Sequence, residues 1–223
     1  ATESDLAQIA GLDLALVFDL RSAKERALHP CRRPEGFAAV VHFGEDPPPR
    51  VREHSAPHVA AAQVPRQRDA ASTREGLRKN YGGIAFRPEL VATMRRFLAG
   101  LAEGKGASLV NCMAGKDRTG IAVAALHLAT GVHRDDIIAD YLLTNTAGDV
   151  EARIAAGMAT ITEVTGQLDL DVLRVLMGVE AEYLEAAFAM MAEKHGSTDG
   201  YLREVLGVDG VMKDRLRAAL VEG

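Results

Sequence analysis

Three short apolar runs in the first half of the chain have the length and composition of buried strands. They lie at 14–20, 37–43 and 107–112. Polar residues, glycine or proline bound each run, as is typical of strand ends. Apolar positions at helical spacing, with cap residues and glycine stops, predict helices at 22–28, 88–104 and 119–131. Strands that alternate with helices indicate an α/β domain with a parallel sheet.

The rest of the chain has two different patterns. Residues 44–80 lose all periodicity and contain three consecutive prolines at 47–49, which predicts a long loop or lid-like excursion. From 131 to 223 one helical pattern follows another, separated by glycines. The sequence therefore predicts a single domain over 1–223, with a small parallel sheet flanked by helices and a helical C-terminal half.

Composition excludes several classes of protein. The 223 residues carry a net charge of −5, whereas proteins that bind nucleic acid over their whole surface are usually basic. No run of 18 apolar residues is present to span a membrane. The two cysteines, Cys31 and Cys112, form neither a disulfide framework nor a zinc template, so we expect no metal or other cofactor. The chain starts at Ala1, which leaves open a cytoplasmic protein or a secreted one that has lost an N-terminal segment.

Charge is unevenly distributed along the chain. Residues 46–100 hold ten Lys or Arg and five Asp or Glu, a net charge of +5. Two interpretations remain open at this point. The arginines either form a solvated loop and helix face, or flank a site for an anionic substrate.

The stretch NCMAGKDRTG at 111–120 lies where a strand turns into a helix. Cys112 is placed at the N-terminus of that helix, where free backbone N–H groups and the helix dipole favour a thiolate, the reactive form. Gly115 allows the loop dihedral angles with which successive N–H groups surround a phosphate. Arg118 adds a planar fork that binds two phosphate oxygens. Thr119 can bring its hydroxyl near the sulfur, and Gly120 lets the helix start tightly.

These features predict a nucleophile inside an oxyanion-binding loop. Cys112, Asp117 and Arg118 are the candidate catalytic residues. The candidate phosphate-binding residues are Met113, Ala114, Gly115, Lys116, Thr119 and Gly120.

The stretch is similar to the C-x5-R-[ST] signature loop of cysteine-dependent phosphatases. In its AGKDRTG form it resembles the bacterial tyrosine/serine protein phosphatase family. Further resemblance lies in FDLRS at 18–22, DYLLTN at 140–145, and EYLEAAF and HGSTDGYL near the C-terminus, so that it covers nearly the whole chain. The family's segment before the DLR strand, which normally helps to complete the sheet, is expected to be trimmed or disordered here.

The resemblance implies a two-step phosphomonoesterase. Cys112 attacks phosphorus to form a phosphocysteine, Arg118 and the loop amides stabilise the transition state, and water hydrolyses the intermediate. A general acid must protonate the leaving oxygen. No WPD tripeptide occurs in the long loop, so Asp117 is the leading candidate, with Asp19 and Asp69 as weaker ones. The other interpretation makes Asp117 a carboxylate that only holds Arg118 or nearby amides.

For each of several residues near the loop, two interpretations remain open. Lys116 adds positive charge at the pocket floor, as similar loops do for phosphoinositides, or faces solvent. Asp19 and Arg21 brace the loop as an ion pair or contact substrate. Asn111 stands where most relatives carry histidine; because asparagine is never cationic, we expect lower activity or a higher pH optimum. Cys31 is a bystander or a redox partner of Cys112.

The expected substrate is phosphotyrosine, extended to phosphoserine, phosphothreonine or phosphoinositide if the chain has dual specificity. The implied partners are thus a phosphorylated protein or a phospholipid headgroup, with phosphate or a phosphate-mimicking anion in the loop. Two other functions stay open. One is a pseudophosphatase that only binds phosphorylated partners, and the other is a phosphatase of a soluble inositol phosphate.

Overall fold

The computed structural model describes residues 1–44, 69–155 and 169–221. Its strands are β1 (Leu16–Asp19), β2 (Val40–Phe43) and β3 (Ser108–Asn111), all parallel, in the order β2-β1-β3. All three predicted strands are therefore confirmed. Asp19 is in register with both Phe43 and Asn111, so the strands end at the same level. Ligand sites of open α/β sheets form at this carboxyl edge.

Only the central strand is fully buried. All four residues of β1 are buried, whereas Val40, Phe43 and Leu109 on the outer strands are exposed. The prediction of a second strand over 37–43 is thus confirmed, but the prediction that this strand is buried is wrong. The cause is the strand order, since β2 has a neighbour along one edge only.

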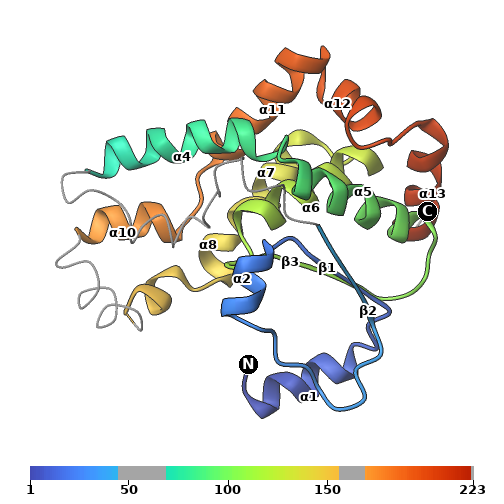
Figure 1. Cartoon of the computed structure of the whole chain (residues 1–223). Helices are drawn as coiled ribbons and strands as arrows, with labels where there is room; N and C mark the ends of the chain where they lie inside the picture. The colour runs from blue at the N-terminus through green and yellow to red at the C-terminus, as the bar shows by residue number, and fades with distance from the viewer. Residues whose placement is uncertain (45–68, 156–168, 222–223) are drawn as a thin grey trace.

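Eleven helices of the described residues surround the sheet. They are α1 (Glu3–Gly11), α2 (Ala23–Leu28), α4 (Ala70–Ile84), α5 (Pro88–Ala102), α6 (Asp117–Thr130), α7 (Arg134–Leu142), α8 (Thr144–Ala147), α10 (Leu170–Met177), α11 (Ala181–His195), α12 (Thr198–Glu204) and α13 (Gly210–Leu220). In Figure 1, α4 to α7 and α11 to α13 gather above the sheet, whereas α1 lies below it. A small parallel sheet with a helical C-terminal half is the fold that the sequence predicts.

The predicted loop over 44–80 is wrong in its last part. Helix α4 begins at Ala70, capped by the side chain of Asp69, which accepts from the Ser72 N–H. Its buried face consists of Thr73, Leu77, Tyr81, Gly82 and Ile84. This stripe is narrow and interrupted by small or polar residues, so the sequence pattern is weak, and packing against α11 stabilises the helix instead. The remainder of the predicted loop, 45–68, lies outside the described residues.

A hydrophobic cluster connects the sheet with the helical half. Within the described residues it extends from Phe18 in β1 through Ile121 in α6 to Leu184 in α11 and Leu216 in α13. Helix α5 approaches the sheet closely because Gly100 has no side chain; a Cβ there would lie 2.9 Å from Phe18 Cζ. Among the described helices, none has the length and apolar character that crossing a lipid bilayer requires.

Candidate active site

The signature loop links the end of β3 at Asn111 to the start of α6 at Asp117. Gly115 has a φ of 70°, the left-handed conformation that favours glycine. Cys112 is only 8% exposed and belongs to the hydrophobic cluster. Met113 and Ala114 are partly exposed, Gly115 is exposed, and the next three residues are buried. The strand, loop and helix that the sequence predicts around the cysteine are thus present.

Arg118 is clamped by a carboxylate from α2. Its Nη1 donates to Glu25 Oε2 at 2.7 Å and its Nη2 to Glu25 Oε1 at 2.8 Å, a bidentate pair. Nη1 also donates to the Leu20 carbonyl at 3.0 Å. Arg118 and Glu25 are each 8% exposed, so the guanidinium is held in one orientation beneath the sheet's carboxyl edge.

The pKa shifts of Glu25 and Arg118 indicate that both side chains are charged. Burial by itself raises the pKa of Glu25, but the hydrogen bonds and charge of Arg118, with the Ser22 contacts, bring that pKa below its ordinary value. Burial by itself lowers the pKa of Arg118, and the Glu25 bonds together with the negative charges of Cys112 and Asp117 raise it overall. The guanidinium therefore lies within electrostatic reach of the Cys112 side chain.

Asp117 accepts a hydrogen bond from one tyrosine, and a second tyrosine donates to the first. Tyr81 of α4 donates its hydroxyl to Asp117 Oδ1 at 2.6 Å, and Tyr141 of α7 donates to the Tyr81 hydroxyl at 2.6 Å. All three side chains are buried. No described hydrogen bond joins Asp117 to Arg118, so the carboxylate does not hold the arginine directly.

Lys116 is buried, which makes the solvent-facing interpretation wrong. It is 2% exposed, and its Nζ donates to the carbonyls of Leu176 at 2.7 Å and Gly178 at 3.0 Å at the end of α10. The same Nζ lies 3.4 Å from Asp117 Oδ1. The buried ammonium group thus ties the loop to the end of α10, a contact that no sequence spacing indicates.

Asp19 and Arg21 form a buried ion pair. Arg21 Nε donates to Asp19 Oδ1 at 2.9 Å and Nη2 to Oδ2 at 2.7 Å. The other contacts of the guanidinium go to the His29 carbonyl and to Cys31 Sγ. Because all three guanidinium nitrogens donate within the chain, the geometry favours bracing over substrate contact. Asn111 Nδ2 reaches Asp19 Oδ1 at 3.5 Å, a long contact.

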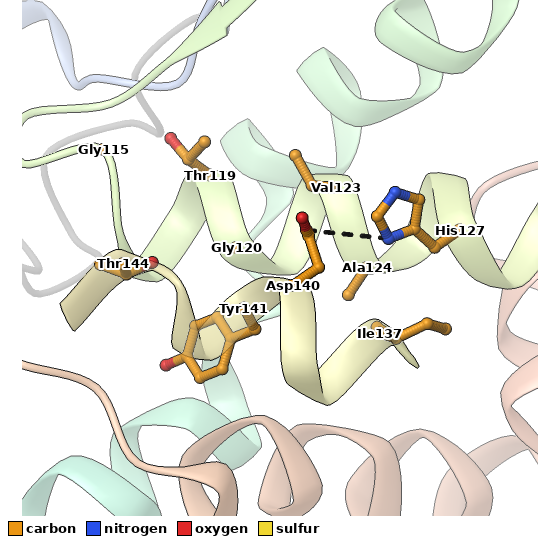
Figure 2. A pocket seen from close by; sticks show the side chains of 10 residues that line it. All are labelled: Gly115, Thr119, Gly120, Val123, Ala124, His127, Ile137, Asp140, Tyr141 and Thr144. Carbon is orange, nitrogen blue, oxygen red and sulfur yellow. Dashed lines mark ion pairs between the residues drawn. The ribbon is translucent and has the colours of Figure 1, made fainter. Parts of the chain in front are cut away.

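Thr119 borders a pocket beside the loop. The pocket, about 170 Å³ in volume, runs between α6 and α7 from Gly115 to His127, and Figure 2 shows Asp140 facing His127 across it. The Thr119 hydroxyl is buried and has no hydrogen-bond partner among the described residues, so its predicted contact with sulfur is not formed. Cys112 does not line this pocket.

In the part of the basic segment that the structure describes, 69–100, most of the arginines are engaged away from the site. Arg74 pairs with Glu180, while Arg95 and Arg96 donate to the carbonyls of Val205 and Phe43. Arg87 at the start of α5 is the exception, with a pKa lowered mainly by burial and also by the nearby charge of Arg118. The arginines between positions 50 and 68 lie outside the described residues, and so do the other residues that directly precede Asp69.

Three residues beside the site were missed from the sequence: Glu25, Tyr81 and Tyr141. Only Glu25 had a local signal, since Ser22 and Glu25 form an S-x-x-E capping box at the start of α2. Tyr81 directly follows the segment predicted as a loop, 44–80, and the DYLLTN stretch gives Tyr141 no signal beyond that of a helix. Their hydroxyls converge on Asp117 through tertiary packing.

A buried cysteine at the end of a parallel strand, with an arginine clamped beside it at the start of the next helix, is the arrangement of a phosphate-binding catalytic loop. The model of the tyrosine phosphatase family matches residues 1–222. The chain belongs to this family and is a tyrosine-phosphatase-like hydrolase.

Two relatives extend the comparison over nearly the whole chain. The triple specificity protein phosphatase PtpB of Mycobacterium tuberculosis is 31% identical over 240 residues, covering 96% of this chain and 85% of that protein. A candidate tyrosine-protein phosphatase of Cupriavidus necator is 32% identical over 216 residues, covering 94% of this chain and 71% of its own length. The bacterial tyrosine phosphatase resemblance is therefore confirmed.

Proposed function

We propose that this chain hydrolyses phosphotyrosine through a phosphocysteine on Cys112. The observation that carries the proposal is the turn from β3 into α6, which has Cys112 buried at its start and Arg118 buried at its end, with the Arg118 guanidinium held by both oxygens of Glu25. An arginine so fixed needs little reorganisation to stabilise the charge that develops on a phosphoryl group. The loop amides from Met113 to Arg118, with the Thr119 hydroxyl, supply the other phosphate contacts in this proposal.

The first step forms one bond and breaks another. The Cys112 thiolate attacks phosphorus, the S–P bond forms, and the P–O bond to the tyrosine oxygen breaks. Asp117 gives its proton to that oxygen as it leaves. In the second step Asp117 takes a proton from water, the water oxygen attacks phosphorus, and the S–P bond breaks to release phosphate and the thiolate.

Substrate range is the finer part of the proposal. The likeness to a phosphatase named for triple specificity supports activity beyond phosphotyrosine, on phosphoserine, phosphothreonine or phosphoinositide. Lys116 gives no separate support for phosphoinositide, because its Nζ is engaged by two carbonyls of the chain. Intact Cys112, Asp117 and Arg118 favour an enzyme over a pseudophosphatase.

The test is turnover of a phosphoaryl substrate by the wild type and by Cys112→Ser. We expect the serine variant to lose at least about a thousandfold in rate, because a serine hydroxyl at neutral pH is a far weaker nucleophile than a thiolate. Trapping the phosphoenzyme by rapid acid quench with labelled substrate gives a second readout. Equal rates for the two proteins would contradict the assignment of Cys112 as the nucleophile.

The acid is tested separately by Asp117→Asn. The variant should slow the release of a poor leaving group about a hundredfold and an activated one only slightly. A uniform loss over all leaving groups would indicate that Asp117 acts only through the structure of the loop. A panel of phosphopeptides and phosphoinositide vesicles then measures the substrate range.

A further inference from the structure

A chain of buried hydroxyl groups ends on the proposed general acid. Tyr141 donates to Tyr81, and Tyr81 donates to Asp117 Oδ1, each at 2.6 Å. Tyr81 is 0% exposed, Tyr141 4% and Asp117 2%. The direction of the chain is set by chemistry, since a carboxylate only accepts and a phenol has a single proton to give. Tyr81 must therefore accept from Tyr141.

Both phenols stay protonated over the range in which an enzyme works. Burial is the main cause that raises the pKa of Tyr81 well above its ordinary value, and the negative charge of Asp117 adds to it. Burial likewise raises the pKa of Tyr141 far above the usual range. The two residues therefore act as neutral hydrogen-bond donors and do not exchange their own protons.

Packing orients the phenol of Tyr81. Its ring contacts those of Tyr141 and Tyr183, with centroid distances of 6.3 Å and 5.4 Å. Tyr141 in turn packs on Gly120 of the signature stretch, where a Cβ would lie 2.8 Å from the ring. The glycine thus allows the tyrosine pair to approach the loop.

The two oxygens of Asp117 are consequently unequal. Oδ1 is contacted by the Tyr81 hydroxyl and by Lys116 Nζ at 3.4 Å. Both described contacts of the carboxylate fall on this oxygen. A donor that already occupies Oδ1 disfavours protonation there, so a proton taken up by the carboxyl group goes to Oδ2.

We propose that Tyr81, supported by Tyr141, is a positioning residue that holds Oδ1 of Asp117 and directs its transferable proton to Oδ2. The inference rests on the proposed role of Asp117 as general acid. The charged and titratable groups near Asp117 include Lys116 beside it, Tyr81 from α4, Tyr141 from α7, Arg118 from α6, Arg87 at the start of α5 and Tyr183 from α11. Of these, only Tyr81 donates a short hydrogen bond to the carboxylate.

The experiment compares Tyr81→Phe, Tyr141→Phe and Asp117→Asn with Tyr183→Phe as the matched control. Tyr183 belongs to the same ring cluster, and its buried hydroxyl has no hydrogen-bond partner among the described residues. For each variant, kcat and KM are measured with aryl phosphates whose leaving phenols range from activated to poor. The pH–rate profile is recorded for one substrate of each kind.

We expect Tyr81→Phe to lower kcat about tenfold for the poor leaving group, with KM unchanged and little effect on the activated one, because it loses one hydrogen bond to a charged group. Tyr141→Phe should show the same dependence on the leaving group with a smaller loss in kcat, about threefold, because the Tyr141 hydroxyl acts on Asp117 only by polarising Tyr81.

Each outcome separates the two proposals. If Asp117→Asn slows all substrates equally, the general acid assignment fails, whatever the tyrosine variants do. If Asp117→Asn is selective for poor leaving groups but Tyr81→Phe matches Tyr183→Phe in rates and pH profile, the positioning role is overturned while the acid stands. Should Tyr81→Phe fail to fold, Tyr141→Phe decides: a leaving-group-dependent loss supports the inference, and behaviour like Tyr183→Phe overturns it.

Discussion

The two sides of the signature loop are built from different chemistry. Arg118 meets a buried carboxylate, Glu25, which comes from α2 in the N-terminal part of the chain. Asp117, its neighbour in sequence, meets the neutral phenol of Tyr81 from α4. A bidentate ion pair thus holds one side. On the other side the short hydrogen bond comes from a chain of hydroxyl groups, and Lys116 Nζ lies farther off, 3.4 Å from Asp117 Oδ1.

The difference matches what each group has to do in the proposed reaction. An arginine stays charged through every step, so a fixed opposite charge stabilises it throughout without hindering the reaction. A general acid must gain and lose a proton, and a carboxylate close to it would oppose the ionised form. Neutral donors orient the acid in both states. Variants on the arginine side should therefore affect all substrates alike, and variants on the aspartate side should depend on the leaving group.

The largest expected effect is that of Arg118→Lys. Lysine keeps the charge but loses the planar fork. It therefore cannot bind both oxygens of Glu25 at the same time, and it cannot bind two phosphate oxygens at the same time. We expect kcat/KM to fall about a thousandfold, by the same factor for activated and poor aryl phosphates. A loss in kcat/KM that increases as the leaving group becomes poorer would contradict the proposed difference between the arginine side and the aspartate side.

Glu25→Gln tests the partner of the arginine. Removing one charge of a buried pair leaves Arg118 without a counter-ion, which costs about 3 kcal/mol in the free energy of unfolding. Activity should fall about tenfold, uniformly over leaving groups, because the guanidinium loses its fixed orientation. Urea unfolding and steady-state kinetics measure the two effects. Glu3→Gln, which breaks an exposed pair with Arg32, is the control and should change stability by less than about 1 kcal/mol.

The same pair predicts how stability depends on pH. Because the folded-state pKa of Glu25 is lowered, its stabilising contribution is fully present above its unfolded pKa of about 4.3 and is lost as the pH falls through the folded value. The difference in unfolding free energy between the wild type and Glu25→Gln should therefore shrink below about pH 4. A difference that stays constant from pH 6 to the acid limit of the native state would mean that Glu25 is not paired as a carboxylate.

The smallest expected effect is that of Lys116→Met, on the aspartate side. The variant leaves two carbonyls at the end of α10 without their donor, so we expect a loss of about 1 to 2 kcal/mol in stability. Because the described hydrogen bonds of Lys116 go to the end of α10 and none goes to Asp117, this variant should not share the leaving-group dependence of the tyrosine variants, and rates on phosphotyrosine peptide and on phosphoinositide should fall by the same few-fold factor. A selective loss of phosphoinositide hydrolysis would show instead that the lysine leaves these carbonyls to contact that substrate.

Local patterns were sufficient for the elements around the nucleophile. The strand before Cys112 and the helix after it are continuous apolar segments with a glycine stop, and β3 and α6 follow that prediction. Gly115 was expected to adopt special dihedral angles, and its φ is positive. Helix α4 was missed because its buried stripe is narrow and its stability comes from α11, a partner about a hundred residues away in sequence.

The environment of Lys116 shows a limit of the same kind. For a lysine between a glycine and an aspartate in a loop, the sequence leaves both a pocket-floor and a solvent-facing position open, since burying an ammonium group is costly without partners. The partners exist, but they are the carbonyls of Leu176 and Gly178, and backbone carbonyls have no sequence signature.

By itself the sequence determined the family, the cysteine and arginine of the loop, and the strand and helix that present them, because all of these depend on residues adjacent along the chain. The tertiary structure alone decided which groups surround them. The contacts between distant segments are those of Glu25 with Arg118, of Tyr81 with Asp117, of Tyr141 with Tyr81, and of the α10 carbonyls with Lys116. Buried polar groups must find partners wherever packing brings them, and that packing is a property of the whole fold.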